Sequence, residues 1–355
     1  MFFGSGNLIY PLFIGHLAEG QWIPATLGFL ITAVLVPIAG VAAMVVYKGD
    51  YTAFFGCLGK KLGFLMAMLL LVVWIPLGSG PRCATLAFAS ILPYVGSTLP
   101  LWLFSIVYCA IVYWVVYKKN RMLDILGYVL TPLLLLCLGL IIVFGVDFSA
   151  ISPHSSMHSY ESFFRGLQEG YNTMDLIASF FFSASVIEIL RRSSHNESLS
   201  LSITLKASLV GAFLLGVVYI GLIGLAASQV AILQSVPKDQ LLVTIAHAVL
   251  GAKLGVISSV AVLLACFTTS VALATVFADF LAEKVFNDEA KYPLALTITQ
   301  IVTFGMSITG LQGISFVTGP ILQVFYPILM VLIVFNVGRE IFTQKQEEKT
   351  VRSVD

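Results

Sequence analysis

The residues of this sequence that could do chemistry lie in short polar interruptions of long apolar stretches. Gly4-Ser5-Gly6 favours an unwound backbone, and Asn7 behind it is a good N-cap for a helix that has Pro11 near its first turn. A helix that starts inside a membrane presents free N–H groups and a partial positive charge, which suit a carboxylate. The carbonyls released at such a break suit a cation. An ordinary turn with glycine packing is the alternative interpretation.

A second polar interruption, Thr173-Met174-Asp175, precedes another apolar stretch. Asp175 is an ionisable group near the start of a membrane span. Burying a charge there is costly, so a residue that carries one is usually functional. Two interpretations are open. Its carboxylate faces a cation or the ammonium group of a substrate, or it marks the interfacial end of a helix.

Consecutive hydroxyl groups, Thr268-Thr269-Ser270, lie in the middle of a further apolar stretch. Hydroxyl oxygens at the centre of a helix can coordinate a hard cation, which prefers oxygen ligands. They can equally bond back to the carbonyl one turn earlier or hold two helices together. The spacing alone leaves both interpretations open.

One positive charge, Arg82, ends a seven-residue run that holds two prolines and two glycines. This composition predicts a kinked or broken helix. Inside an apolar stretch the guanidinium must reach water, a carboxylate or a carbonyl. Arg82 is therefore either a gate or substrate contact, or a side chain that extends to the membrane surface.

The composition defines the class of protein that must position these residues. Of 355 residues, 59% are hydrophobic and 10% are charged, against about 25% charged in a typical soluble chain. This excludes an ordinary soluble enzyme, a disordered chain and a nucleic-acid binder. No Walker loop, HExxH motif, nucleophile elbow or dinucleotide fingerprint occurs, and the five cysteines form no CxxC pair. We expect no enzyme, no organic cofactor and no transition-metal site.

The apolar stretches are continuous and long, as transmembrane helices require, rather than alternating as in barrel strands. We predict an all-α membrane protein with ten helical segments in the lipid bilayer. They are residues 8–18, 25–47, 63–92, 99–117, 123–145, 171–190, 203–228, 253–282, 293–310 and 314–337.

Loop charges predict the orientation of these segments. If the spans alternate, fifteen of the 19 Lys and Arg residues fall on one side, and only Arg165, Lys238 and Lys253 fall on the other. Because cytoplasmic loops are enriched in Lys and Arg, we expect the first side to be the cytoplasm, with both termini inside.

The segment lengths also repeat after five spans. Segments 1 and 6 are short or interrupted, and segments 3 and 8 are the longest. A second copy of a five-span unit must enter the membrane inverted, and inverted repeats with matching broken helices are typical of secondary transporters. The predicted divisions are a first repeat at 1–145, an external loop and second repeat at 146–338, and a polar cytoplasmic tail at 339–355.

At these residues the chain resembles the bacterial branched-chain amino acid:cation symporters of the amino acid–polyamine–organocation superfamily. The resemblance rests on six stretches in order along the chain: FFGSGNLIYP (2–11), GFLITAV (28–34), GPRCAT (80–85), GYNTMD (170–175), ACFTTSVAL (265–273) and GPILQVFYP (319–327). It implies a LeuT-type 5+5 inverted repeat of about ten transmembrane helices in the bacterial inner membrane.

The resemblance also implies a transport activity and a site. The expected activity is sodium-coupled import of leucine, isoleucine and valine. The implied substrate-binding residues are Gly4, Ser5, Gly6, Asn7, Thr173, Met174 and Asp175. The implied sodium ligands are Asn7, Thr269 and Ser270. Arg82 matches the family and stays a possible gate.

Family members carry apolar sequence before the FFGSGN-like motif, whereas Met1 directly precedes it here. We therefore expect a first helix truncated in its cytoplasmic half. A non-transporting remnant or membrane sensor of the same fold is the main alternative, a proton-coupled amino acid symporter is a second, and a channel is a third. Saturable, stereospecific uptake separates a symporter from a channel.

Overall fold

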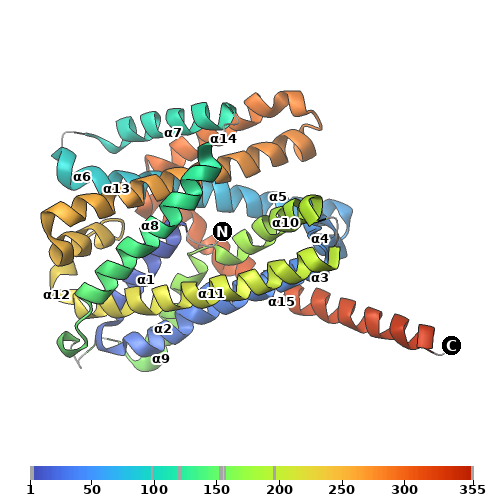
Figure 1. Cartoon of the computed structure of the whole chain (residues 1–355), viewed down its shortest axis with the longest axis horizontal. Coiled ribbons are helices and arrows are strands. Elements are labelled where there is room, and N and C mark those ends of the chain that lie inside the picture. Colours follow the sequence, from blue (N-terminus) through green and yellow to red (C-terminus); the bar gives the residue numbers. More distant parts are fainter. Residues whose placement is uncertain are drawn as a thin grey trace.

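The computed structural model describes residues 4–96, 99–118, 122–151, 155, 157–194 and 197–352, and these residues are helical with no strand among them (Figure 1). The helices are α1 (Ser5–Ala18), α2 (Trp22–Leu30), α3 (Val36–Val46), α4 (Tyr51–Phe55), α5 (Lys60–Trp74), α6 (Gly80–Val95), α7 (Leu101–Tyr117), α8 (Met122–Gly145), α9 (Ser159–Tyr171), α10 (Asp175–Ser194), α11 (Glu197–Ser228), α12 (Val230–Leu233), α13 (Leu241–Phe280), α14 (Tyr292–Ser307) and α15 (Gly310–Arg352).

Six helical stretches are long and apolar enough to cross a membrane. They are Ser5–Val46, Lys60–Val95, Ser159–Arg191, Leu199–Ser228, Gly255–Val285 and Gly310–Glu340. Shorter apolar helices cover Leu101–Tyr117, Pro132–Gly145 and Leu241–Gly251. The chain is a multi-pass, all-helical membrane protein, which confirms the predicted class.

Two of the long helical stretches each contain a π-helical turn rather than a break. Ile31–Leu35 links α2 to α3, and Ile75–Ser79 links α5 to α6. Pro76 in the second turn has no N–H to donate, and a wider turn accommodates this loss without ending the helix. Where the sequence predicts a kinked or broken helix before Arg82, the structure has this π-helical turn, and the helix continues through it.

The predicted loop ahead of residue 171 contains a helix, α9, which the sequence analysis did not anticipate. It packs on α2 through glycines on both helices. A Cβ atom added to Gly28 would lie 2.1 Å from the Phe163 carbonyl oxygen, and one added to Gly166 would lie 2.1 Å from the Ala25 carbonyl oxygen. The two backbones therefore touch, as small residues allow between membrane helices.

Replacing Gly166 with alanine is expected to destabilise the protein by about 1–3 kcal/mol, because the added methyl group separates two backbones that have no room for it. Thermal unfolding in detergent measures the loss. Gly216 in α11 is a matched control, since nothing lies within 4 Å of a Cβ atom added there. Gly216→Ala should keep or raise the unfolding temperature. Equal effects of both substitutions would contradict the close packing of α2 on α9.

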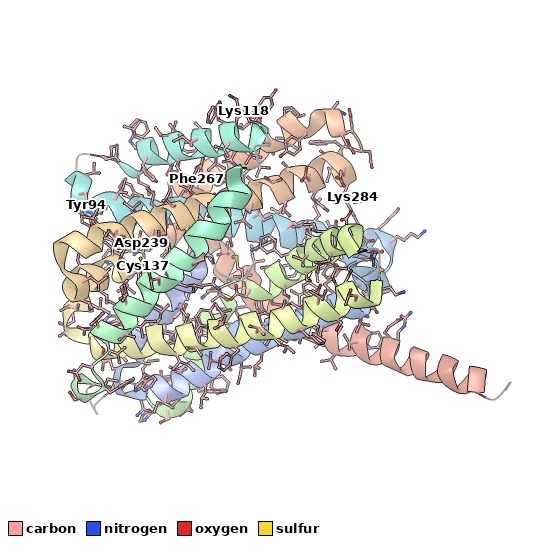
Figure 2. All side chains as sticks on the ribbon, viewed as in Figure 1. Tyr94, Lys118, Cys137, Asp239, Phe267 and Lys284 are labelled. Carbon is pink, nitrogen blue, oxygen red and sulfur yellow. The ribbon has the colours of Figure 1, made fainter. Side chains whose placement is uncertain are left out.

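The loops gather at two ends of the bundle. Figure 2 shows Tyr94 at one end and Lys284 at the other. At the Lys284 end, Arg191 Nη2 donates to the Lys48 carbonyl oxygen at 2.8 Å. Asp50 caps α4 there, accepting from the Thr52 and Ala53 amides. Its pKa lies below the usual value although burial opposes this, because the bond from the Thr52 hydroxyl, the two amide bonds and the Lys284 charge favour the carboxylate.

Residues 339–352 of the predicted polar tail belong to the last helix. α15 runs to Arg352, and Figure 1 shows its C-terminal end projecting away from the other helices. The first helix begins inside the bundle, since Ser5, Gly6 and Asn7 are all buried.

Candidate functional site

The start of α1 places polar groups deep in the protein. Gly4 precedes the helix in an extended conformation, and the Asn7 amide N–H donates to the Gly4 carbonyl oxygen at 3.2 Å. The prediction of Asn7 as the N-cap is therefore wrong, because Gly4 occupies that position. The Asn7 side chain does not cap α1 and reaches across to another helix instead.

A break between two helices faces the start of α1. α9 ends at Tyr171 and α10 begins at Asp175, with Met174 between them at a φ of +64°. A left-handed backbone is uncommon for methionine and marks a conformation that the surroundings enforce. The Thr173 hydroxyl donates to the Gly170 carbonyl oxygen at 2.8 Å, which ties the segment to the last turn of α9.

The start of α1 touches the break between α9 and α10. A Cβ atom added to Gly6 would lie 3.2 Å from both Cα and the carbonyl oxygen of Thr173. Asn7 Nδ2 donates to both carboxylate oxygens of Asp175, at 3.2 and 3.1 Å. The structure thus brings together the two segments that the sequence predicted separately.

Tyr219 of α11 completes this group and was missed by the sequence analysis. Its hydroxyl donates to Asp175 Oδ2 at 2.9 Å and accepts from Asn7 Nδ2. Asn7, Asp175 and Tyr219 are all buried. They form a polar cluster, called the Asp175 cluster below, at the meeting of α1, α10 and α11.

The hydroxyls of α13 lie on the other side of the α1 start. A Cβ atom added to Gly4 would lie 3.9 Å from Thr269 Cγ2 and 3.9 Å from Asn7 Oδ1. The Thr269 hydroxyl bonds back to the Ala265 carbonyl oxygen at 2.8 Å. Ser270 Oγ lies 2.8 Å from Tyr108 Oη and is beside Cys83, which is also beside Ser5. Thr269 therefore borders Gly4, whereas Ser270 faces α6 and α7.

Arg82 of α6 is fully buried and connects four elements. Its Nη1 donates to the Asn172 carbonyl oxygen in the α9–α10 interruption, and its Nη2 donates to Thr318 Oγ1 of α15 at 2.9 Å. The guanidinium carbon lies 5.1 Å from the centre of the Tyr10 ring. The side chain thus binds a carbonyl inside the protein and does not extend to the surface.

The described residues hold no group of three or more His, Cys, Asp or Glu side chains that could bind a transition metal. The buried polar side chains around the start of α1 and the α9–α10 break are instead Asn7, Asp175, Tyr219 and Arg82, and Thr269 is half-buried beside Gly4. Helices interrupted at depth, with buried polar groups at the interruptions, characterise membrane transporters.

Comparison with known proteins agrees with this class. The sequence model of the family described as branched-chain amino acid transport protein matches residues 1–353. A protein of Staphylococcus saprophyticus named as a branched-chain amino acid carrier is 30% identical over 347 residues, covering 92% of this chain and 77% of the relative. The branched-chain amino acid permease BraB of Bacillus subtilis is 27% identical, covering 98% of this chain and 79% of the permease. The chain belongs to the branched-chain amino acid transport family, and it is a transporter rather than an enzyme.

Proposed function

We propose that this protein is a secondary symporter that imports leucine, isoleucine and valine with sodium. The observation that carries the proposal is the contact between the start of α1 and the break between α9 and α10, made by Gly6 on Thr173 and by Asn7 on Asp175. Membership of the branched-chain amino acid transport family supports the substrate class.

The proposed architecture is the LeuT-type 5+5 inverted repeat, with a first unit at 1–145 and a second at 146–338. The interruptions at α1 and at α9–α10 then occupy equivalent places in the two units. Such transporters bind cargo where half-helices meet near the middle of the bilayer.

In this arrangement the segment Gly4–Asn7 and the segment Thr173–Asp175 line the substrate site. Asn7, Thr269 and Ser270 supply oxygen atoms to the sodium ion, a hard cation. Arg82 closes the site by holding Asn172 of the second interruption. One sodium ion that moves inward across 100 mV releases about 2.3 kcal/mol. That drives a gradient of roughly fifty-fold, at about 1.4 kcal/mol per factor of ten.

We place the protein in the cytoplasmic membrane of a bacterium with both termini inside. The contact of Arg191 with Lys48 supports this orientation, because the positive-inside rule assigns both residues to the cytoplasm.

Competition for bound leucine tests the substrate class. An apolar pocket separates side chains that differ by one methylene by only about 1–3 kcal/mol, so isoleucine and valine should displace radiolabelled leucine from the purified protein. Glycine should displace it poorly, and arginine and glutamate should not displace it. Displacement by arginine or glutamate as strong as that by leucine would contradict the assignment.

Thr269→Ala is expected to raise the sodium concentration for half-maximal leucine uptake by about tenfold or more, because one ligand of a hard cation is lost. Uptake at saturating sodium should change far less. Thr275→Ala is a matched control, since Thr275 lies in the same helix and makes the same bond to the carbonyl one turn earlier. An unchanged sodium dependence in Thr269→Ala would exclude Thr269 as a ligand.

A further inference from the structure

A small polar cavity lies next to Ser270, between α7, α13, α14 and the π-helical turn that precedes α6. About 10 Å³ of it is open to the centre of a water-sized sphere, which is just enough for one water molecule. An amino acid does not fit, so the cavity is no part of the substrate site. Its polar lining comes from Tyr108, Ser270, Thr299, Gln300 and Thr303.

Two side chains of α14 face this cavity without a partner. Gln300 is 8% exposed and Thr303 is 6% exposed, and neither side chain forms a hydrogen bond to another described residue. Thr299 and Ser307 of the same helix bond back to carbonyl oxygens of α14, whereas Thr303 Oγ1 lies 3.4 Å from a Cβ atom added to Gly80. Burying an amide and a hydroxyl without a partner is unfavourable. The pair therefore indicates a small polar ligand.

The cavity is also lined by two hydroxyl groups that bond to each other. Ser270 Oγ of α13 and Tyr108 Oη of α7 lie 2.8 Å apart, and both residues are buried. Their shared bond uses one of the two hydroxyl hydrogens, so the pair can donate one more hydrogen bond and accept others. A ligand that both donates and accepts can connect this pair to the α14 side chains.

Charge separates the two ligands that are small enough, a water molecule and a bare cation. None of the described residues that line the cavity is acidic, so a cation would be buried with no opposite charge, which is the costly case. A buried water molecule needs about two to four polar partners. Gln300, Thr303 and the Tyr108–Ser270 pair supply them, and the Gln300 amide both donates and accepts. The lining thus favours water.

We propose that this cavity binds one water molecule, held by Gln300 and Thr303, which hydrogen-bonds to the Tyr108–Ser270 pair. Gln300 and Thr303 are then positioning residues that fix the Ser270 hydroxyl from α14. This role rests on the proposed function, in which Ser270 is a sodium ligand. The affinity for sodium accordingly depends on two residues of α14 that do not touch the ion.

Thermal unfolding of the purified full chain tests the bound water by the sign of the effect. Thr303→Val keeps the shape of the side chain and removes its hydroxyl. With water bound, this substitution removes one partner of the water and should lower the unfolding temperature by about 1–2 °C. In a dry cavity it would remove an unpaired polar group and raise the unfolding temperature, which would overturn the inference. Thr297→Val is the control, because the Thr297 hydroxyl bonds to the Pro293 carbonyl oxygen at an exposed position of the same helix.

The sodium dependence of leucine uptake into proteoliposomes tests the action on Ser270. Gln300→Leu should raise the sodium concentration for half-maximal uptake by about fivefold, while uptake at saturating sodium stays nearly unchanged. Thr303→Val should shift it in the same direction, and Thr303→Ser, which keeps the hydroxyl, should restore the wild-type value. In a Ser270→Ala background Gln300→Leu should add no further shift, because the hydroxyl on which it acts is gone.

Two uptake results would overturn the inference. A full additional shift by Gln300→Leu in the Ser270→Ala background would show that Gln300 does not act through Ser270. A sodium Hill coefficient of about two in the wild type that falls to about one in Gln300→Leu would make the cavity a second cation site. Wild-type uptake that is independent of sodium would instead contradict the proposed function, and the unfolding temperature of Thr303→Val would still decide whether the cavity holds water.

Discussion

Replacement of Arg82 by methionine is expected to lower leucine uptake by about a hundredfold or more. Methionine keeps much of the length and apolar volume of the side chain but donates no hydrogen bond. The bonds to the Asn172 carbonyl oxygen and to Thr318 are both lost. A hydrogen bond to a charged group contributes about 1.5–3 kcal/mol, and each 1.4 kcal/mol is a factor of ten.

We expect this loss of leucine uptake because Arg82 joins the two halves of the chain. The residue belongs to α6, whereas its hydrogen-bond partners belong to the α9–α10 interruption and to α15. Without it the second interruption is no longer held against α6, and the site cannot close around its substrate. Arg82→Lys keeps the charge but not the two-pronged donor geometry, so uptake should be intermediate.

Uptake into proteoliposomes measures the effect, normalised to folded protein by size-exclusion chromatography. Thr318→Val removes only the bond from Nη2 and should cost about tenfold. If Arg82→Met took up leucine at the wild-type rate and with the wild-type half-saturating leucine concentration, the proposed role of Arg82 in closing the site would be contradicted.

Replacement of Asn7 by leucine is expected to abolish uptake, with a loss of about a hundredfold or more. Leucine has nearly the shape of asparagine but leaves the Asp175 carboxylate without two donated bonds, and an unsatisfied buried charge is the costly outcome. The same change removes Asn7 Oδ1, an oxygen atom that we propose as a sodium ligand. Neither a higher leucine concentration nor a higher sodium concentration should restore transport.

Asn336 of α15 is the matched control for this change. It is also a fully buried asparagine, and its Nδ2 donates to the Phe54 carbonyl oxygen at 2.9 Å, far along the chain from either interruption. Asn336→Leu should lower thermal stability yet keep uptake per folded molecule within about threefold of wild type. Similar losses of uptake in both variants would show that any buried asparagine matters equally, against a special role for Asn7.

The interruptions could be predicted from the sequence because their causes are local. Glycines at positions 4 and 6 and the polar run 172–175 stand out in apolar surroundings. Helix α9 was missed for the opposite reason. Its sequence is polar enough to look like a loop, and what makes it a packed helix is its contact with α2 through Gly166, a partner more than 130 residues away in the chain.

Tyr219 could not be predicted for a related reason. It lies within an apolar run of α11 with no polar neighbour, and its partners Asn7 and Asp175 are 212 and 44 residues away. A single tyrosine in such a run has no local signal that separates a hydrogen-bonding residue from an ordinary core aromatic. Arg82 was singled out correctly as a charge that must be satisfied, but only the fold shows that a carbonyl of the second interruption satisfies it.

The most direct test of symport is radiolabelled leucine uptake into proteoliposomes of this chain, with and without an inward sodium gradient. We expect saturable uptake of L-leucine that rises above equilibrium only when the sodium gradient and an interior-negative potential are imposed. Excess isoleucine and valine should suppress it, and D-leucine should not. Leucine accumulation that is independent of sodium and follows an imposed proton gradient would contradict the proposed coupling. Absence of uptake under every gradient would contradict the proposed function.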